Sequence, residues 1–452
     1  MSGRCIDQKT TLTRHPIFSL RLAMSATSTP AVAPSSDQPP RAPMQDVSQA
    51  LDTLLAAAVP VLEHESVDVL EAGGRVLAEP VTACIDVPGM DNSQMDGYAV
   101  RAADCASGQA RLRVSQRIPA GHVGQPLEAG TAARIFTGAM MPQGADAVVM
   151  QEACETEGDY VVIRHVPKSG EWVRMIGEDI RQGSTILAAG TRLRPQELGL
   201  AASIGQARLQ VLRPVRVAVF FTGDELTMPG QPLKPGGIYN SNRFLLRGLL
   251  QKLGCQVSDF GIVPDSLEAT RLTLREAARE HDLIITSGGV SVGEEDHVKP
   301  AVEAEGRINM WQIAMKPGKP LAFGQVRRGT GVGEEGSEAF FLGLPGNPVS
   351  SFVTFLLFVR PFILRLQGLP HESVLPQPVA MRADFDWPRA DRRREFLRVR
   401  RNAQGGLDLF PSQGSAVLTS TVWADGLIDN PPGQTIAAGD TVQFLAFDAL
   451  LN

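Results

Sequence analysis

Hydrophobic and polar residues change their spacing several times along the chain, and each change predicts a different kind of structure. From Asp46 to Val61, apolar side chains recur at helical spacing. From about residue 73 to 195, short β-rich runs alternate with Pro, Gly and Asp turns, which predicts one or two small β-rich domains. Helical spacing returns briefly at 195–204, where Pro195 suits a first helical turn.

The segment from about 215 to 366 is predicted to form an α/β domain with a mostly parallel sheet. It alternates strands that are apolar on both faces with amphipathic helices, as a sheet covered by helices on both sides requires. The expected strands are 216–222, 256–263, 282–286 and 339–344. Three helices are expected: one that ends before Gly254, one at 266–281 and one at 349–364. After about residue 367, short strands and turns return, which predicts a small C-terminal β domain.

Composition fits several globular domains and excludes other classes of protein. The 452 residues are 43% hydrophobic and 20% charged with a net charge of −6, which excludes collagen-like, fully disordered and basic nucleic-acid-binding proteins. The longest apolar run, 350–364, is interrupted by Arg360 and Pro361 and is too short to span a bilayer, so no membrane partner is expected. Five cysteines without a CxxC pair favour a reducing, cytoplasmic compartment over a disulfide scaffold or a zinc ribbon.

Residues 1–43 are rich in Ser, Thr and Pro, and we predict that they form a disordered tail. Their acid-poor, Arg-containing start faintly resembles a transit peptide. The alternative is an N-terminal extension, with the true start at Met24. Nothing in this segment resembles a cleaved secretory signal.

The candidate chemistry follows the predicted strands of the α/β domain. In an open parallel sheet, ligands bind beyond the carboxyl ends of the strands, where loops and helix N-termini converge. Here those ends deliver Asp224-Glu225, Pro264-Asp265, a glycine- and acid-rich loop at 287–296, and a Pro-Gly loop at 345–348. Because all four should lie at one edge of the sheet, we predict a single binding site there.

The residue types at this edge predict an anionic, phosphorylated ligand that is bound together with Mg²⁺. Glycine loops such as Gly288-Gly289 let backbone N–H groups approach an anion. Carboxylates would repel a phosphate unless a divalent cation lay between them, and Mg²⁺ is commonly held by one or two carboxylates plus phosphates. Of only seven lysines, Lys299, Lys316 and Lys319 lie close together in the sequence and add compact positive charge.

Each of these features also has a purely structural explanation. Asp265 could cap the helix that follows it, with Glu268 completing a capping box. Asp224 and Glu225 could form a solvated turn, the glycine pair could simply reverse the chain, and the lysines could lie in an exposed loop. The glycine-rich run 329–333 is predicted to be a hairpin tip rather than a phosphate loop, and no P-loop motif occurs.

A second polar cluster lies in the β-rich region. The run DNSQMDGYAVR places Asp96 directly before a predicted strand, and Thr137 and Asp179 lie in the polar runs RIFTGA and GEDI. An Asp-Gly pair is also a strong hairpin signal, so Asp96 could serve a turn alone.

Eight motifs taken together resemble one known family. In order over roughly residues 88–350, the chain contains DNSQMDGYAVR, RIFTGAMMPQGADAVVMQE, GEDI, TGDEL, IYNSNR, SGGVSVGEEDHVK, MKPGKPLAFG and GLPGNPVS. These motifs resemble those of the molybdopterin molybdenumtransferase (MoeA) family, to which the E domain of gephyrin is related. The resemblance covers nearly everything after the N-terminal tail.

The resemblance implies a multi-domain α/β plus β fold. It implies a tail at 1–43, a discontinuous elongated N-terminal linking domain (44–63 and 176–210), a β-rich inserted domain (64–175), a central α/β molybdopterin-binding domain with a mostly parallel sheet (211–367) and a small C-terminal β-barrel-like domain (368–452). The implied reaction is insertion of molybdate into adenylylated molybdopterin with Mg²⁺ and release of AMP, the last step of molybdenum cofactor biosynthesis. The implied partners are a second copy of the chain, molybdopterin adenylyltransferase and target molybdoenzymes.

The resemblance also assigns roles to residues by their place in the motifs. The implied catalytic residues are Asp96, Thr137, Asp179, Glu225, Asp296 and Lys316. The implied substrate-binding residues are Asp265, Ser287, Gly288, Gly289, Lys319, Pro345, Gly346, Pro348, Arg398 and Ser415. The implied Mg²⁺ ligands are Glu225, Asp265 and Asp296, while Asp96, Thr137 and Asp179 would close the site from the partner subunit.

Two positions depart from the family pattern, and two other functions stay open. Gln312 stands where related sequences often have Lys, and His297 stands where Tyr is usual. A molybdopterin adenylyltransferase would need only the α/β domain and would consume ATP, but the long region around 91–101 argues against it. A non-enzymatic scaffold, which animal relatives have become, would release no AMP, but the near-complete set of acidic and Lys positions argues against it.

Overall fold

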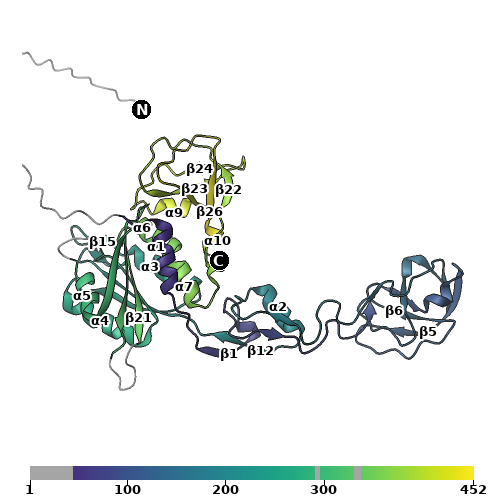
Figure 1. Ribbon diagram of the computed structural model, residues 1–452. Helices are drawn as coiled ribbons and strands as arrows, with labels where there is room; N and C mark the ends of the chain where they lie inside the picture. The colour runs from purple at the N-terminus through teal and green to yellow at the C-terminus, as the bar shows by residue number, and fades with distance from the viewer. Residues whose placement is uncertain (1–43, 291–295, 330–336, 452) are drawn as a thin grey trace, which may run out of the picture. The chain divides into compact units, whose positions relative to one another are not determined.

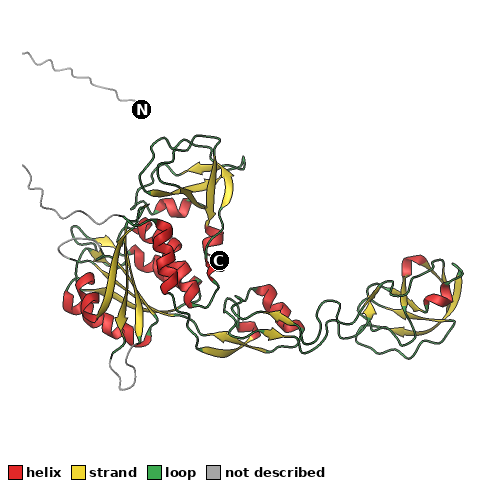
Figure 2. Cartoon of the chain, in the orientation of Figure 1, coloured by secondary structure: helices red, strands yellow, loops and turns green. Residues whose placement is uncertain are grey.

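The computed structural model describes residues 44–290, 296–329 and 337–451. The predicted tail at 1–43 and most of the predicted hairpin tip at 329–333 lie outside the described residues. The described chain contains an α/β domain, a small N-terminal domain, an inserted β domain and a C-terminal β domain (Figure 1 and Figure 2).

A six-stranded sheet in the order β16-β13-β17-β21-β20-β18 forms the centre of the α/β domain. Its strands are β13 (Arg216–Thr222), β16 (Gln256–Val263), β17 (Leu283–Ser287), β18 (Gly306–Gln312), β20 (Pro320–Arg327) and β21 (Glu338–Leu344). The first four strands of the order are parallel, and β20 is antiparallel to both of its neighbours. The prediction of a mostly parallel sheet is therefore confirmed.

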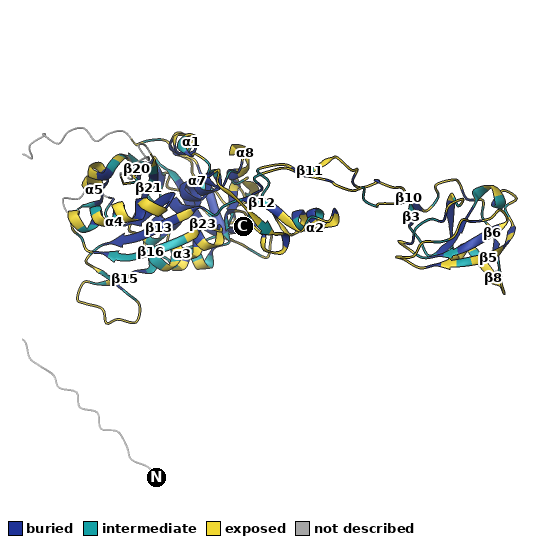
Figure 3. Cartoon of the chain, turned by 90° about the horizontal axis from the view of Figure 1, so that it is seen from below, coloured by how far each residue is buried: buried dark blue, intermediate teal, exposed yellow. Residues whose placement is uncertain are grey.

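Helices cover both faces of this sheet. They are α1 (Val47–Ala57), α3 (Ser241–Lys252), α4 (Leu267–Glu280) and α5 (Val298–Glu305), together with the segment from α6 (Pro348–Thr354) to α7 (Arg360–Leu366). One face packs against α1, α3 and α6–α7, and the other packs against α4 and α5 (Figure 1). Neighbouring Phe220 and Phe221 of β13 point into opposite cores, and both are fully buried, like the rest of this strand's centre (Figure 3).

The apolar run that follows β21 forms one continuous helix. It consists of α6 (Pro348–Thr354), a π-helical turn (Phe355–Val359) and α7 (Arg360–Leu366). The predicted helix at 349–364 is confirmed and continues through Arg360 and Pro361, where a π-helical turn precedes the proline. The Arg360 guanidinium donates to the carbonyls of Val374 (3.0 Å) and Ala449 (3.2 Å). Within the described chain this is the one helix long and apolar enough to cross a membrane, so the expectation that the run is too short is wrong. Because 94% of its apolar 18-residue window is buried, core packing explains its apolarity.

A small domain near the N-terminus is built from two distant segments. In it, β1 (His64–Asp68) pairs with β12 (Arg208–Leu212), β2 (Val81–Thr82) pairs with β11 (Thr185–Leu187), and α2 (Pro195–Ser203) packs beside them. This pairing corrects the predicted start of the inserted domain at residue 64, because residues 64–87 pack with 180–212. The partners lie more than 100 positions apart, so the local pattern could not show that they pair.

The inserted domain contains a six-stranded sheet in the order β7-β4-β6-β5-β9-β8. Its strands are β4 (Gly97–Val100), β5 (Ala110–Ile118), β6 (Thr131–Ile135), β7 (Ala147–Met150), β8 (Cys154–Glu157) and β9 (Tyr160–Ile163). A short pair, β3 (Asn92–Ser93) with β10 (Val173–Arg174), lies where the chain enters and leaves this domain. The predicted β-rich character of this region is confirmed.

The C-terminal domain is also built on a six-stranded sheet, in which β24 pairs with β23 beside the path β19-β23-β25-β26-β22. Its own strands are β22 (Val379–Arg382), β23 (Arg394–Arg401), β24 (Leu407–Leu409), β25 (Gly426–Asn430) and β26 (Thr441–Ala446). The short helices α8 (His371–Val374), α9 (Thr419–Trp423) and α10 (Phe447–Leu451) accompany them. The remaining strand, β19 (Met315–Lys316), comes from the α/β segment and joins the two domains.

Asp282 fastens the amino ends of β13 and β17 to each other. Its carboxylate accepts hydrogen bonds from Arg213 (2.7 and 2.9 Å) and from the backbone N–H of Arg216 (2.9 Å). Burial opposes ionisation of Asp282, but these hydrogen bonds outweigh it and hold its pKa below the usual range. We expect Asp282→Asn to lower the free energy of unfolding at pH 7 by about 3 kcal/mol, because the buried Arg213 loses its buried carboxylate partner and keeps only the exposed Glu63.

Urea unfolding followed by circular dichroism measures this loss. The wild type loses the Asp282 contribution as the pH falls from about 4 through the lowered folded-state pKa, so the gap between the two proteins should narrow there. Equal urea midpoints at pH 7 would contradict the expected role of Asp282.

Candidate functional site

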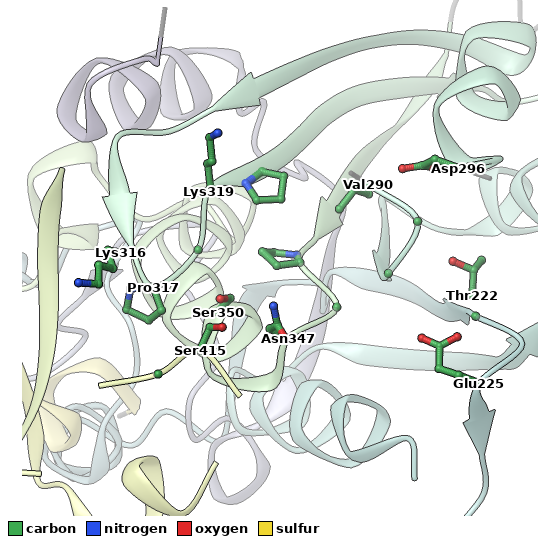
Figure 4. A pocket seen from close by; sticks show the side chains of 18 of the residues that line it. Thr222, Glu225, Val290, Asp296, Lys316, Pro317, Lys319, Asn347, Ser350 and Ser415 are labelled. Carbon is green, nitrogen blue, oxygen red and sulfur yellow. The ribbon is translucent and has the colours of Figure 1, made fainter. Parts of the chain in front are cut away.

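Loops that follow the parallel strands line one cavity of about 710 Å³ (Figure 4). The α/β domain contributes Thr222, Gly223, Glu225, Asp265, Gly288, Gly289, Val290, Asp296, Lys316, Pro317, Gly318, Lys319, Pro320, Pro345, Gly346, Asn347 and Ser350, and the C-terminal domain contributes Arg393, Gln413, Gly414 and Ser415. The cavity lies at the carboxyl edge of the sheet, where the strand ends bring distant parts of the sequence together.

Carboxylates and ammonium groups occupy different ends of the cavity. Glu225 and Asp296 lie with Thr222 at one end, and Lys316 and Lys319 lie at the other (Figure 4). An elongated anion with a metal-binding group at one end would match this division of charge.

Each carboxylate stands just after a strand or just before a helix. Glu225 follows β13 and precedes β14 (Leu226–Thr227), which pairs with β15 (Ile238–Tyr239). Asp265 follows β16, and the helix after it is capped by Ser266, whose hydroxyl accepts from the Ala269 N–H at 3.3 Å. The alternative of Asp265 as the helix cap is therefore wrong, and its side chain lines the cavity instead. Asp296 accepts from the Val298 N–H at 3.2 Å and so stands at the start of α5.

The glycine loop after β17 is held in place by a buried network. Gly288 and Gly289 have φ angles of +102° and +62°, which favour glycine. The Asn242 amide donates to the Ser287 hydroxyl (2.8 Å) and to the Gly346 carbonyl (2.8 Å), and Ser287 donates to the Pro345 carbonyl (3.0 Å). Asn242 thus ties two strand-end loops together from the first turn of α3. Asn242 belongs to the motif IYNSNR, but the motif alone predicts no role for it.

Two of the three lysines singled out from the sequence line the cavity. Lys316 ends β19, and Lys319 directly precedes β20, with Pro317 and Gly318 between them. Lys299 does not line it: it lies on α5, 3.9 Å from the Glu303 carboxylate. The expectation that all three lysines serve one site is therefore corrected for Lys299.

The C-terminal domain closes part of the cavity wall. The Ser415 carbonyl accepts from the Val349 N–H at 3.0 Å, which links this wall to the start of α6. Arg398 does not line the cavity; it is fully buried and donates to the Gly414 carbonyl (3.2 Å) and to Ser420 (3.2 Å). Burial lowers the pKa of Arg398 to about 10. Arg398 therefore shapes the loop that carries Ser415.

Pro348 lies in the first turn of α6 and, like Ser287, supports the cavity without lining it. Four further residues that were not predicted as site residues also line the cavity: Arg393, Gln413, Asn347 and Ser350. The first two could not have been found from strand ends, since they come from a different domain.

The structure does not bring Asp96, Thr137 or Asp179 to this cavity. The Asp96 carboxylate accepts from the N–H and the hydroxyl of Thr137, both at 2.8 Å, and these bonds hold its pKa below the usual value. Asp96 thus joins the turns before β4 and after β6. The Asp179 N–H donates to the Val87 carbonyl at 3.0 Å, in the small N-terminal domain.

Gln312 and His297, the two residues that depart from the family pattern, lie in different parts of the α/β domain. Gln312 ends β18, where it pairs with Pro320 at the cavity edge. His297 directly precedes α5 and follows Asp296. Neither side chain lines the cavity.

No group of three His, Cys, Asp or Glu side chains close enough to hold a metal ion occurs within the described parts of the chain. The three acidic residues predicted as metal ligands nevertheless line the same cavity. A divalent ion held by one or two carboxylates and completed by ligand phosphates fits this arrangement.

The α/β domain and its cavity place the chain in the class of molybdopterin-binding proteins. The family model described as a probable molybdopterin binding domain matches residues 218–365. The models of the MoeA N-terminal region (domains I and II) and the MoeA C-terminal region (domain IV) match residues 45–205 and 380–447. The chain therefore belongs to the MoeA family.

Relatives agree with this assignment over most of their length. The chain is 38% identical over 419 residues to the molybdopterin molybdenumtransferase of Haemophilus influenzae, which covers 90% of this chain and all of the relative. It is 41% identical over 342 residues to the enzyme of the same name from a Nostoc species, which covers 73% and 76%. The crystal structure of a molybdopterin biosynthesis MoeA protein from Pyrococcus horikoshii OT3 superposes with a TM-score of 0.76 at 28% identity, covering 89% of this chain and 100% of that one.

Proposed function

We propose that this protein is a molybdopterin molybdenumtransferase that inserts molybdate into adenylylated molybdopterin and releases AMP. The observation that carries the proposal is the single cavity that Glu225, Asp265, Asp296, Lys316 and Lys319 line together. Family membership and the names of the relatives support the transferase activity. The carboxylates and lysines of the cavity support the binding of an anionic substrate together with Mg²⁺.

The proposed substrate contains a phosphoanhydride and so carries several negative charges. Glu225, Asp265 and Asp296 would hold Mg²⁺ against the pyrophosphate, and the ion would supply Lewis-acid stabilisation of the charge that develops as the anhydride breaks. Lys316 and Lys319 would bind oxyanions at the other end of the cavity. The glycine loop at 288–289 would let backbone N–H groups approach a phosphate oxygen.

The cysteines fit a substrate whose own dithiolene must capture a soft metal. Burial raises the pKa of Cys105 and Cys154 to about 11 and that of Cys255 to about 12, so these side chains stay protonated at neutral pH. Protonated thiols compete poorly for molybdenum. We place the protein in a reducing cytoplasm, in keeping with four free cysteines among the described residues.

We further propose a homodimer in which Asp96, Thr137 and Asp179 of the second copy approach the cavity. The motifs that contain these residues support this assignment, although one chain alone does not carry them to the cavity. The enzyme would receive its substrate from a molybdopterin adenylyltransferase and pass its product to molybdoenzymes.

The test is AMP release from purified adenylylated molybdopterin by the purified full chain. We expect release that requires molybdate, is abolished by EDTA and returns with added Mg²⁺. ATP consumption without molybdate dependence would indicate an adenylyltransferase instead. A failure to release AMP under all conditions would indicate a scaffold, and retained activity in excess EDTA would exclude the role of Mg²⁺.

A further inference from the structure

The ammonium group of Lys316 is held from behind by carboxylates of the C-terminal domain. Its Nζ lies 2.9 Å from Oε1 of Glu395 and 3.6 Å from Oδ2 of Asp391. The Trp387 ring centroid lies 5.8 Å away, within reach of a cation–π interaction. Lys316 is thus anchored on one side while it lines the cavity on the other.

Glu395 is fixed more firmly than a surface ion-pair partner would be. Its side chain is 1% exposed, and its second oxygen accepts from Trp387 Nε1 at 2.8 Å. Its backbone is also fixed, because β19 and β23 pair in parallel with Lys316 opposite Glu395. Both Glu395 carboxylate oxygens therefore have a defined partner: Oε1 pairs with Lys316, and Oε2 accepts from Trp387.

The neighbouring cavity cation Arg393 is also paired with a carboxylate. Asp391 accepts from Arg393 Nε (3.0 Å) and Nη2 (2.9 Å), and the Arg393 guanidinium holds the pKa of Asp391 well below its usual range. Two cavity cations, Lys316 and Arg393, thus face two carboxylates, Asp391 and Glu395. Lys319 has no ion-pair partner among the described residues, so the net positive charge at this end of the cavity rests on it.

We propose that Glu395 is a positioning residue that sets the direction of the Lys316 ammonium and weakens its attraction for the incoming oxyanion. This inference rests on the proposed transferase function. An anion that approaches Lys316 must share the ammonium with the carboxylates behind it. Lys319 then provides most of the attraction for the free anion, and Lys316 provides an oriented donor for the reacting group.

The variant Glu395→Gln tests these different roles of Lys316 and Lys319. Glutamine has the same shape and can still accept the hydrogen bond of Trp387, but it removes the charge behind Lys316. We expect the KM for molybdate to fall about threefold to tenfold, as an ion pair of ordinary strength would give, and kcat to fall about tenfold as the lysine loses its orientation. A residue with a purely structural role would not lower KM and kcat together.

Matched variants separate the possible outcomes. Glu372→Gln removes an exposed carboxylate on α8 and should leave both constants unchanged. Trp387→Phe keeps a ring beside Lys316 but removes the donor to Glu395, so kcat should fall while the KM for molybdate does not. This variant also provides a test if Glu395→Gln does not fold.

Two results would overturn the inference. One is a Glu395→Gln enzyme with unchanged kcat and KM, and the other is a KM for molybdate that rises. Both are judged against a wild type that releases AMP in the same assay. A wild type without molybdate-dependent AMP release would instead reject the proposed function, so the two failures are distinguishable.

Discussion

Replacing Asp296 by asparagine is expected to lower molybdate-dependent AMP release by roughly 100-fold to 1000-fold, the usual cost of removing one group that stabilises transition-state charge. Asp296 shares the acidic end of the cavity with Glu225 (Figure 4). Asparagine can still accept the hydrogen bond of the Val298 N–H, so the start of α5 should remain intact. The variant therefore removes a charge and little else.

The measurement is kcat for AMP release at saturating molybdate and substrate, titrated with Mg²⁺. If Asp296 helps to hold the ion, the variant should also need more Mg²⁺ for half-maximal activity. Asp224→Asn is the matched control, because Asp224 is an exposed acid one residue before Glu225 and does not line the cavity. A variant of Asp296 that keeps more than a third of the wild-type kcat would remove this residue from the reaction.

The residues that follow the parallel strands could be predicted from the sequence, because the topology of a parallel sheet decides where they lie. Parallel strands end at the same edge, so Glu225, Asp265 and the loop at 287–290 had to converge once the strands were recognised. The strands themselves were visible because they are apolar on both faces. The cavity brings these residues together as that rule requires.

The rest depends on contacts between segments far apart in the sequence. Arg393 reaches the cavity, and Glu395 reaches the cavity lysine Lys316, because β19, only two residues long, pairs with β23. No local pattern marks so short a strand. Arg398 illustrates a second limit: a family motif marks the position, but only the fold shows that the side chain is buried against carbonyl groups rather than exposed to a ligand.

A third limit concerns local rules that tertiary structure overrides. Pro361 would normally kink or end a helix, because it has no N–H to donate and its ring clashes with the carbonyl four residues earlier. Here the Arg360 N–H donates to the Phe355 carbonyl across a π-helical turn, and the buried guanidinium finds two carbonyl partners. Packing in the core thus maintains a helix that local propensity argues against.

Replacing Gly288 by alanine is expected to reduce kcat by at least about 100-fold, because the glycine loop would move away from the substrate. A Cβ on Gly288 would lie 2.6 Å from the carbonyl oxygen of Thr222, at a φ angle of +102°. Backbone contacts this short cannot be relieved by rotating a side chain, so β13 and the loop after β17 must separate. Thr222 lies at the acidic end of the cavity, so this separation would displace the groups around it (Figure 4).

Gly254→Ala is the matched control that separates the contact from the backbone angle. Gly254 follows α3 with a φ of +76°, and a Cβ there meets nothing within 4 Å. Both variants carry the cost of a positive φ, about 1 kcal/mol of stability, but only Gly288→Ala carries the contact. Thermal unfolding should therefore show a small loss in Gly254→Ala and a larger loss in Gly288→Ala, and the assay of AMP release should show a loss of kcat in Gly288→Ala alone. Equal activity in the two variants would mean that the close approach of the loop to Thr222 does not set the catalytic geometry.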